Sequence, residues 1–329
     1  MNSYIAPLRL SLAGGGTDVP PFCEEFGSHV INFAIQKYVK ISIKPAEEES
    51  DTPVKLTLKN YQNQTQARDL FVKRLEQSLN QCFAPERAID IEVLNPVKPS
   101  SGLGTSSSMI IATLKALDDH FDRDFNLLGL VSEAIRMERN EMGILGGFQD
   151  YFPAVYGGLN SIKYSKRDQW AITRIEMNEK VRMFLEESIF AFELGIKRNS
   201  QQVVKDQIER ASIHKSETQS ALLEQLQTST ALLGALRDGK IDDVMDLVEN
   251  SYLQKKKFSP LITNEYIDDI ELKLRAKGAR GIKVSGAGGG GHMFCFFPSG
   301  IPKDLLQELP KNISVLSVKL EQEGFRKLS

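Results

Sequence analysis

A glycine- and serine-rich stretch from Pro99 to Met109, PSSGLGTSSSM, constrains this chain more than any other feature. An apolar alternation over residues 89–93 predicts a strand before it, and apolar residues at helical spacing over 110–121 predict a helix after it. A loop that opens a helix presents free backbone N–H groups and the positive end of the helix dipole, which favour an anion. Because Gly102 and Gly104 carry no Cβ, the backbone can come close to that anion.

The four hydroxyl residues that follow the glycines admit two interpretations. Residues 105–108, TSSS, can supply hydroxyls to phosphate oxygens or to a metal ion bound to them. They can equally be a serine-rich helix cap, which is a common arrangement. No lysine follows the glycines, so the stretch is not a GxxxxGK[ST] phosphate loop.

Length and composition limit the classes of protein that this chain can be. With 329 residues it should hold two domains, which we place at 1–178 and 179–329. The formal net charge of −2 predicts no bulk attraction to nucleic acid or to an acidic membrane. No apolar run approaches the length of a membrane span, and we recognise no secretory signal at the N-terminus.

The cysteines and histidines argue against disulfides and against a zinc centre. The three cysteines are odd in number and far apart, as expected of reduced thiols in a cytoplasmic protein. The four histidines show no spacing typical of metal ligands, which argues against a zinc hydrolase.

The first glycine run follows a predicted strand. Leu8, Leu10 and Leu12 alternate with Arg9 and Ser11, which predicts a half-buried strand. The strand leads into the sequence AGGGTD, whose three glycines allow a ligand to approach the backbone. Arg9 would then reach the same cavity as the aspartate that ends the run, Asp18. A surface arginine, an aspartate helix cap and a plain turn explain the same residues.

The region between these two glycine runs mixes strands and helices. Residues 38–44 and 53–59 alternate as strands, and we expect the acidic stretch 47–51 between them to be a hairpin loop. Apolar residues at helical spacing predict a helix over 66–83.

A carboxylate lies on the apolar stripe of the next predicted helix. Asn126 can cap this helix, which runs to Met142 and carries Glu138 on its buried face. A buried carboxylate needs a partner. Either Arg136 or Arg139 can form an ion pair with it, or it can bind Mg²⁺.

Two further polar positions carry open alternatives. Asp150, in the sequence GGFQDY, is either a general base or a turn residue. Lys197 and Arg198 follow a predicted strand and precede a helix, where they can hold a second anion or lie in solvent. The lysines at 255–257 are typical of a solvated helix end.

The second half predicts an α+β sandwich. Helical patterns fill 214–236, 241–253 and 264–277, and strands are expected over 190–192, 292–297 and 313–320. Between the last helix and the final strands lies GIKVSGAGGGG, whose glycines lose conformational entropy without any packing return. Such a run marks a place where backbone passes close to a ligand or another loop.

Three glycine-rich stretches together resemble the motifs of one family, the GHMP small-molecule kinases. They are residues 6–18, 99–107 and 283–291, in the order of the family and spread over most of the chain. The resemblance implies an α+β fold with an N-terminal β/α domain like ribosomal protein S5 and a C-terminal ferredoxin-like sandwich. It also implies an enzyme that uses ATP and Mg²⁺ to phosphorylate a small alcohol.

Within the family the resemblance is to one branch. The segments AGGGTD, ERNEMGILGGFQD and KVSGAGGGGHMF resemble the heptose kinases, which phosphorylate the anomeric hydroxyl of D-glycero-D-manno-heptose 7-phosphate and are close to fucokinases. The chain departs from that branch at Tyr151, Tyr252 and His292, where glutamine, tryptophan and phenylalanine are usual.

The resemblance implies a role for each matched residue. Asp150 matches the base that takes the acceptor proton, and Arg9 the residue that orients it. Ser106 and Glu138 match the Mg²⁺ ligands. The ATP-binding loop implied by the match is Pro99, Ser100, Ser101, Gly102, Leu103, Gly104, Thr105, Ser106 and Ser107. The implied substrate residues are Gly15, Gly16, Thr17, Asp18, Gly147, Gln149, Lys197 and Arg198.

Two other functions compete with a heptose 7-phosphate kinase. One is the same chemistry on an unphosphorylated sugar such as fucose or galactose. The other, from a different class, is a catalytically silent sensor of sugar and nucleotide; the presence of all four predicted catalytic and metal residues argues against it. We expect a sugar and ATP as partners, no nucleic acid and no membrane; a homodimer is compatible with the sequence.

Overall fold

The computed structural model describes residues 2–46, 53–59, 66–85, 88–97, 101–165, 169–196 and 199–328, without the side chains of 66–68. The whole predicted acidic loop, 47–51, lies outside these residues, and so do Pro99, Ser100, Lys197 and Arg198.

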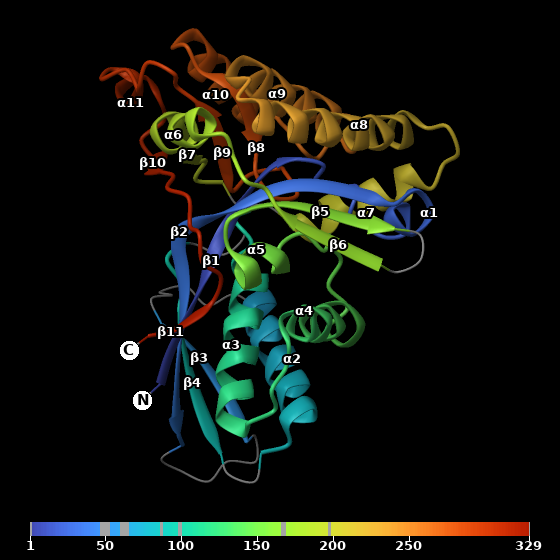
Figure 1. Ribbon diagram of the computed structural model, residues 1–329, viewed down its shortest axis with the longest axis vertical. Helices are drawn as coiled ribbons and strands as arrows, with labels where there is room; N and C mark the ends of the chain where they lie inside the picture. Colours follow the sequence, from blue (N-terminus) through green and yellow to red (C-terminus); the bar gives the residue numbers. More distant parts are fainter. Residues whose placement is uncertain are drawn as a thin grey trace.

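The first lobe is built on a seven-stranded sheet (Figure 1). The order β11-β1-β2-β4-β3 forms its main path, and β5 and β6 extend from the first part of β2. The strands are β1 Asn2–Ala13, β2 Ser28–Pro45, β3 Val54–Lys59, β4 Ile89–Leu94, β5 Leu159–Ser165, β6 Gln169–Arg174 and β11 Arg326–Leu328. Because β11 pairs with β1, the chain returns to this lobe at its end, and the two termini lie close together (Figure 1).

Two expectations about these strands are wrong. The strands over 38–44 and 53–59 do not form a hairpin, because β4 lies between β2 and β3 and pairs with β3 in parallel. The strand that carries Arg9 is not half-buried: both of its faces are covered from Ile5 to Ala13. An alternating sequence shows which face is apolar, but it cannot show that distant segments cover the polar face, as Asp150 and the glycine- and serine-rich stretch cover Arg9.

Helices cover one face of this sheet. They are α2 Gln66–Phe83, α3 Thr105–Phe121, α4 Leu127–Ile135 and α5 Tyr151–Tyr156. The short helix α1 Phe22–Phe26 lies apart from them, and its Phe22 packs in the apolar cluster of the second lobe. Asn126 caps α4 as predicted, its side chain accepting from the Gly129 N–H. The predicted helix then continues as a π-helical turn, Arg136–Glu141, in which Met142 N–H donates to the Met137 carbonyl. Such turns are rare and often occur at functional sites.

The second lobe holds an antiparallel sheet in the order β10-β7-β9-β8. Its strands are β7 Ile189–Glu193, β8 Arg280–Val284, β9 His292–Phe296 and β10 Ser314–Ser317. Its helices are α6 Glu179–Ser188, α7 Ser200–Ala211, α8 Glu217–Asp238, α9 Ile241–Lys256, α10 Glu265–Ala276 and α11 Leu305–Glu308. The predicted α+β class is therefore confirmed. The predicted division at residue 178 falls between β6 and α6, and it stays a prediction.

The two lobes share apolar packing. The larger core cluster is centred on the first sheet and continues into the second lobe through Val181, Leu185 and Phe294. Helices α8 and α9 also contact the long strands β1 and β2 (Figure 1). Among the described residues, no helix is long and apolar enough to cross a membrane.

Candidate active site

One cavity of about 510 Å³ brings together most of the predicted site residues. From the loop before α3 it is lined by Ser101, Gly102, Gly104, Thr105, Ser106 and Ser107. From the other segments it is lined by Arg9, Gly15, Gly16, Asp18, Glu138, Gly147, Gln149 and Asp150. Of the predicted residues that the structure describes, two do not line it: Leu103 is buried, and Thr17 is buried with its hydroxyl donating to the Gly14 carbonyl.

Side chains from other segments donate hydrogen bonds to the carbonyl groups of this loop. His292 Nδ1 lies 2.9 Å from the Ser101 carbonyl oxygen and donates to it. Ser285 Oγ donates to the Gly102 carbonyl at 2.8 Å, and Arg9 Nη1 donates to the same oxygen. These bonds occupy the carbonyls on the side of the second lobe. The N–H groups at the start of α3 are then left to meet an anion in the cavity.

Sequence reasoning missed the roles of His292 and Ser285. The histidine was noted only as a departure from the heptose branch. The signal available was the third glycine run itself, since a run of glycines marks a close approach of backbone segments. The structure shows that the segment approached is the loop before α3.

Arg9 and Asp150 form a bidentate ion pair across the cavity wall. Arg9 Nε donates to Asp150 Oδ1 at 2.8 Å, and Nη2 donates to Oδ2 at 2.6 Å. The arginine side chain is 4% exposed, whereas that of Asp150 is 25% exposed. A planar guanidinium that binds both oxygens fixes the plane of the carboxylate while leaving one edge open to the cavity.

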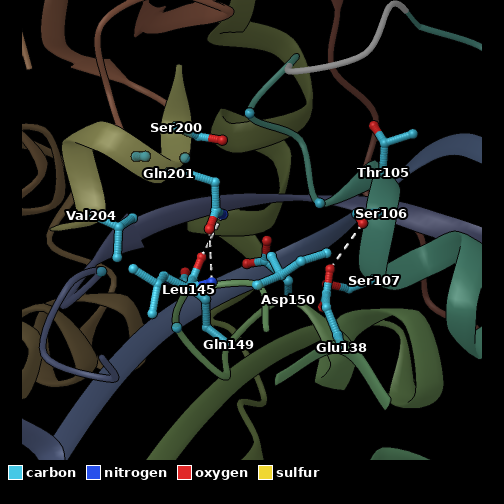
Figure 2. A pocket seen from close by; sticks show the side chains of 18 of the residues that line it. Thr105, Ser106, Ser107, Glu138, Leu145, Gln149, Asp150, Ser200, Gln201 and Val204 are labelled. Atoms are coloured by element: carbon cyan, nitrogen blue, oxygen red, sulfur yellow. Dashed lines mark hydrogen bonds between the residues drawn. The ribbon is translucent and has the colours of Figure 1, made fainter. Parts of the chain in front are cut away.

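Glu138 has a different environment. Its carboxylate accepts hydrogen bonds from Ser106 Oγ at 2.9 Å, from Ser107 Oγ at 3.5 Å and from Tyr151 Oη (Figure 2). Burial is the main cause that raises the pKa of this carboxyl group above its ordinary value. Figure 2 shows Glu138 and Ser106 pointing toward each other from different helices.

The predicted ion pair of Glu138 is not formed among the described residues. Arg136 instead pairs with Glu133 at 2.5 Å and with Glu141. Arg139 makes no ion pair in the described part of the chain and lies over the Phe148 ring. Of the two alternatives for Glu138, an arginine ion pair is therefore not observed among the described residues, and the Mg²⁺ alternative stays a prediction.

The residues around Glu138 fit a magnesium ion that arrives with phosphates. Glu138 accepts hydrogen bonds only from neutral hydroxyls and forms no ion pair with the described residues, so the nearby charge of Arg139 compensates its burial only in part. Mg²⁺ binds oxygen ligands and takes one or two carboxylates plus substrate phosphates. Within the described ranges no three histidine, cysteine, aspartate or glutamate side chains cluster as metal ligands, so a site built wholly from protein is not found there.

Asp18 closes the other end of the cavity. Its Oδ2 accepts from the Gln149 N–H at 2.9 Å, and its Oδ1 accepts from the Gly16 N–H at 3.0 Å. Burial is the main cause that raises the pKa of Asp18. A Cβ on Gly147 would lie 2.0 Å from Asp18 Oδ2, so only glycine fits there. Beside it, Ser11 Oγ and Gln149 Oε1 are buried with no hydrogen-bond partner.

Two lysines contact the site in ways that the sequence did not reveal. Lys283 is fully buried, donates to the Ser11 carbonyl at 3.2 Å and has its pKa lowered to about 7, chiefly by burial. Lys255, expected at a solvated helix end, is buried instead and donates to the Gly286 carbonyl. For Lys283 the available signal was a charged residue inside an apolar strand.

Comparisons with known proteins show which family this chain is similar to. Residues 68–158 match the GHMP kinases N terminal domain, and residues 232–314 match the GHMP kinases C terminal domain. The chain is 23% identical to a D-glycero-alpha-D-manno-heptose 7-phosphate kinase of Campylobacter jejuni, over 93% of this chain and 92% of that protein.

Solved structures share the fold. A D-glycero-D-manno-heptose 1-phosphate kinase from Bacteroides thetaiotaomicron superimposes with a TM-score of 0.76 at 22% identity, covering 100% of this chain and 99% of that one. Lactococcus lactis galactokinase complexed with galactose gives a TM-score of 0.74 at 16% identity, over 99% and 95% of the two chains. With both domains matched and the architecture shared over its full length, this chain belongs to the GHMP kinase family and is a phosphotransferase.

Proposed function

We propose that this protein is an ATP- and Mg²⁺-dependent sugar kinase that phosphorylates an anomeric hydroxyl. The acceptor we propose is D-glycero-D-manno-heptose 7-phosphate, and the product is the 1,7-bisphosphate. One observation carries the proposal: the Ser106–Glu138 pair and the Arg9–Asp150 pair line the same cavity, beside a glycine- and serine-rich helix start.

The nucleotide end of the proposed site consists of the loop and α3. Backbone N–H groups of this loop would bind the phosphates of ATP, with hydroxyls from residues 105–107 beside them. Ser106 and Glu138 would hold Mg²⁺, whose chemistry is to neutralise charge on the transferred phosphoryl group. We also assign Pro99 and Ser100 to this loop, on the family resemblance alone.

The acceptor end consists of Arg9, Asp150 and Asp18 with the glycines beside them. Asp150 would take the proton from the anomeric hydroxyl as that oxygen bonds to phosphorus. An anomeric hydroxyl is more acidic than an ordinary alcohol, which suits a carboxylate base. Arg9 would hold Asp150 in place and stabilise negative charge at the attacking oxygen.

The residues that would bind the sugar are Asp18, Gln149 and the glycines at 15, 16 and 147. Their buried polar atoms include two without partners, Ser11 Oγ and Gln149 Oε1, which can meet sugar hydroxyls. Thr17 would support this loop through its bond to the Gly14 carbonyl. Lys197 and Arg198 remain candidates for a substrate phosphate from the sequence alone.

A kinase for an unphosphorylated sugar is the second candidate. It is favoured by the likeness in fold to a galactokinase whose structure contains galactose. A coupled ADP-release assay over heptose, heptose 7-phosphate, fucose, galactose and mannose separates the two. The proposal predicts the highest kcat/KM for heptose 7-phosphate, and it is wrong if a neutral sugar is preferred.

A further inference from the structure

Among the residues that the structure describes, five cationic side chains line the cavity, and four of them form hydrogen bonds within the protein. Arg9 holds Asp150 and the Gly102 carbonyl. The other three donate to backbone carbonyls; they are Arg74 to Met142 at 2.6 Å, Lys255 to Gly286, and Lys283 to Ser11 at 3.2 Å. The fifth is Arg139.

Arg139 makes no hydrogen bond and no ion pair within the described ranges. Its Cζ atom lies 4.2 Å from the centroid of the Phe148 ring. That ring is itself packed against Trp170, at 4.9 Å between centroids. Stacking on a packed ring restrains the guanidinium while leaving available the N–H donors, which lie in the plane of the guanidinium itself.

The position of Arg139 connects it to both ends of the cavity. It follows Glu138 directly in the π-helical turn. The residue on which it stacks, Phe148, lies between Gly147 and Gln149, the two residues that contact or approach Asp18. Because Arg139 is only partly buried, its guanidinium can stay without an ion pair at the cavity wall, where a phosphate of a ligand can reach it.

We propose that Arg139 binds a phosphate group carried by the acceptor. The inference rests on the proposed function and names the feature of the acceptor that this chain recognises. A guanidinium matches the geometry of a phosphate with two parallel N–H donors, which a lysine cannot do. The same chemistry would suit a phosphate of the nucleotide, so the test must separate the two sources.

The test uses the full chain with three substitutions. Arg139→Gln removes the charge, and Arg139→Lys keeps the charge but loses the planar fork. The matched control is Arg136→Gln, which removes an arginine from the same turn that pairs with Glu133 and Glu141 and does not line the cavity. KM is measured for heptose 7-phosphate, for the same heptose without phosphate, and for ATP.

We expect Arg139→Gln to raise KM for the phosphorylated heptose by about 10- to 100-fold, the range of a lost charge-assisted bidentate contact. KM for the neutral heptose and for ATP should stay within about threefold, as should all three in Arg136→Gln. The KM of Arg139→Lys for the phosphorylated heptose should lie between the KM of the wild type and that of Arg139→Gln. An equal rise for both sugars, or a rise confined to ATP, overturns the proposal; the latter assigns Arg139 to the nucleotide.

A binding measurement keeps this inference apart from the proposed function. Calorimetry without nucleotide gives the Kd of heptose 7-phosphate for the wild type and each variant, whether or not turnover occurs. Equal Kd in the wild type and Arg139→Gln overturns the role of Arg139. If the protein phosphorylates neutral sugars only, the role of Arg139 is also overturned, but the protein remains a sugar kinase. If it phosphorylates no sugar at all, the proposed function itself is wrong.

Discussion

Glu138 and Asp150, two carboxylates that line the same cavity, differ in what compensates their charge. Asp150 forms a bidentate ion pair with the guanidinium of Arg9 and keeps one edge exposed. Glu138, twelve positions earlier, is buried and receives only hydroxyl donors, and burial raises the pKa of its carboxyl group. Figure 2 shows both side chains in the same pocket.

This difference suggests how two carboxylates in one cavity can have different roles, one as a base and the other as a metal ligand. A carboxylate already paired with a cation has little need of a metal ion but can accept a proton from a neighbouring hydroxyl. A carboxylate without a cation gains most from one that a ligand brings. Consecutive residues separate the two roles, because Asp150 meets Arg9 while Tyr151 meets Glu138.

The substitution Asp150→Asn should have the largest effect. It keeps the size of the side chain but removes the proposed base, so we expect kcat to fall by about 10²- to 10⁴-fold. The affinity for ATP, measured by calorimetry, should change little. A kcat within about threefold of the wild type would show that Asp150 is not the base, and the proposed difference in role between Asp150 and Glu138 would be wrong.

The substitution Tyr151→Phe tests the Glu138 end. The lost hydroxyl orients the glutamate, and loss of such an outer contact commonly weakens metal binding by about 10- to 100-fold. The measurement is the Kd of Mn²⁺ in the presence of a non-hydrolysable ATP analogue. Tyr156→Phe, in the same helix, is the control, because it lies outside the cavity lining and its pKa is raised by burial alone. Equal effects of the two changes would refute an orienting role.

The substitution Gly147→Ala tests the acceptor end without touching a polar group. Its Cβ would lie 2.0 Å from Asp18 Oδ2, and displacing that carboxylate should cost about 1–3 kcal/mol and raise KM for the sugar about tenfold. Gly146→Ala is the matched control, since nothing lies within 4 Å of a Cβ there. The idea fails if both variants bind the sugar equally well.

The smallest predicted effect is on the pH dependence of stability. The pKa of Lys283 is lowered to about 7 in the folded chain, mainly by burial, while an unfolded lysine titrates near 10.5. Between these values the unfolded state holds the extra proton, so this lysine makes the unfolding free energy rise with pH, by at most about 1.4 kcal/mol per pH unit. Denaturant unfolding at pH 7 to 9 should show a steeper rise in the wild type than in Lys283→Met. Parallel profiles would contradict the lowered pKa.

Much of the fold followed from local patterns. The helix over 66–83, the cap at Asn126 and the strand over 190–192 were predicted because periodicity and caps are local properties. The hairpin was wrong because strand neighbours depend on distant pairing, here of β4 between β2 and β3. The burial of both faces of β1 was not predicted, because nothing in its own sequence reveals the distant segments that cover it.

In the site, too, local features were predicted from the sequence and long-range contacts were not. The loop before α3 was located from its glycines and serines, yet the residues that hold its carbonyls, Ser285 and His292, come from 180 or more positions away. The hydroxyl partners of Glu138 were not predicted, because the π-helical turn that aims it cannot be read from periodicity. Long-range contacts of this kind leave no local pattern.

The proposed mechanism requires that Glu138, and not Asp150, binds the metal ion. Electron paramagnetic resonance of Mn²⁺ with a non-hydrolysable ATP analogue measures this directly in the wild type, Glu138→Gln and Asp150→Asn. We predict a Kd about 10- to 100-fold higher in Glu138→Gln and within about threefold of the wild type in Asp150→Asn. Equal weakening in both variants, or unchanged binding in Glu138→Gln, would contradict it.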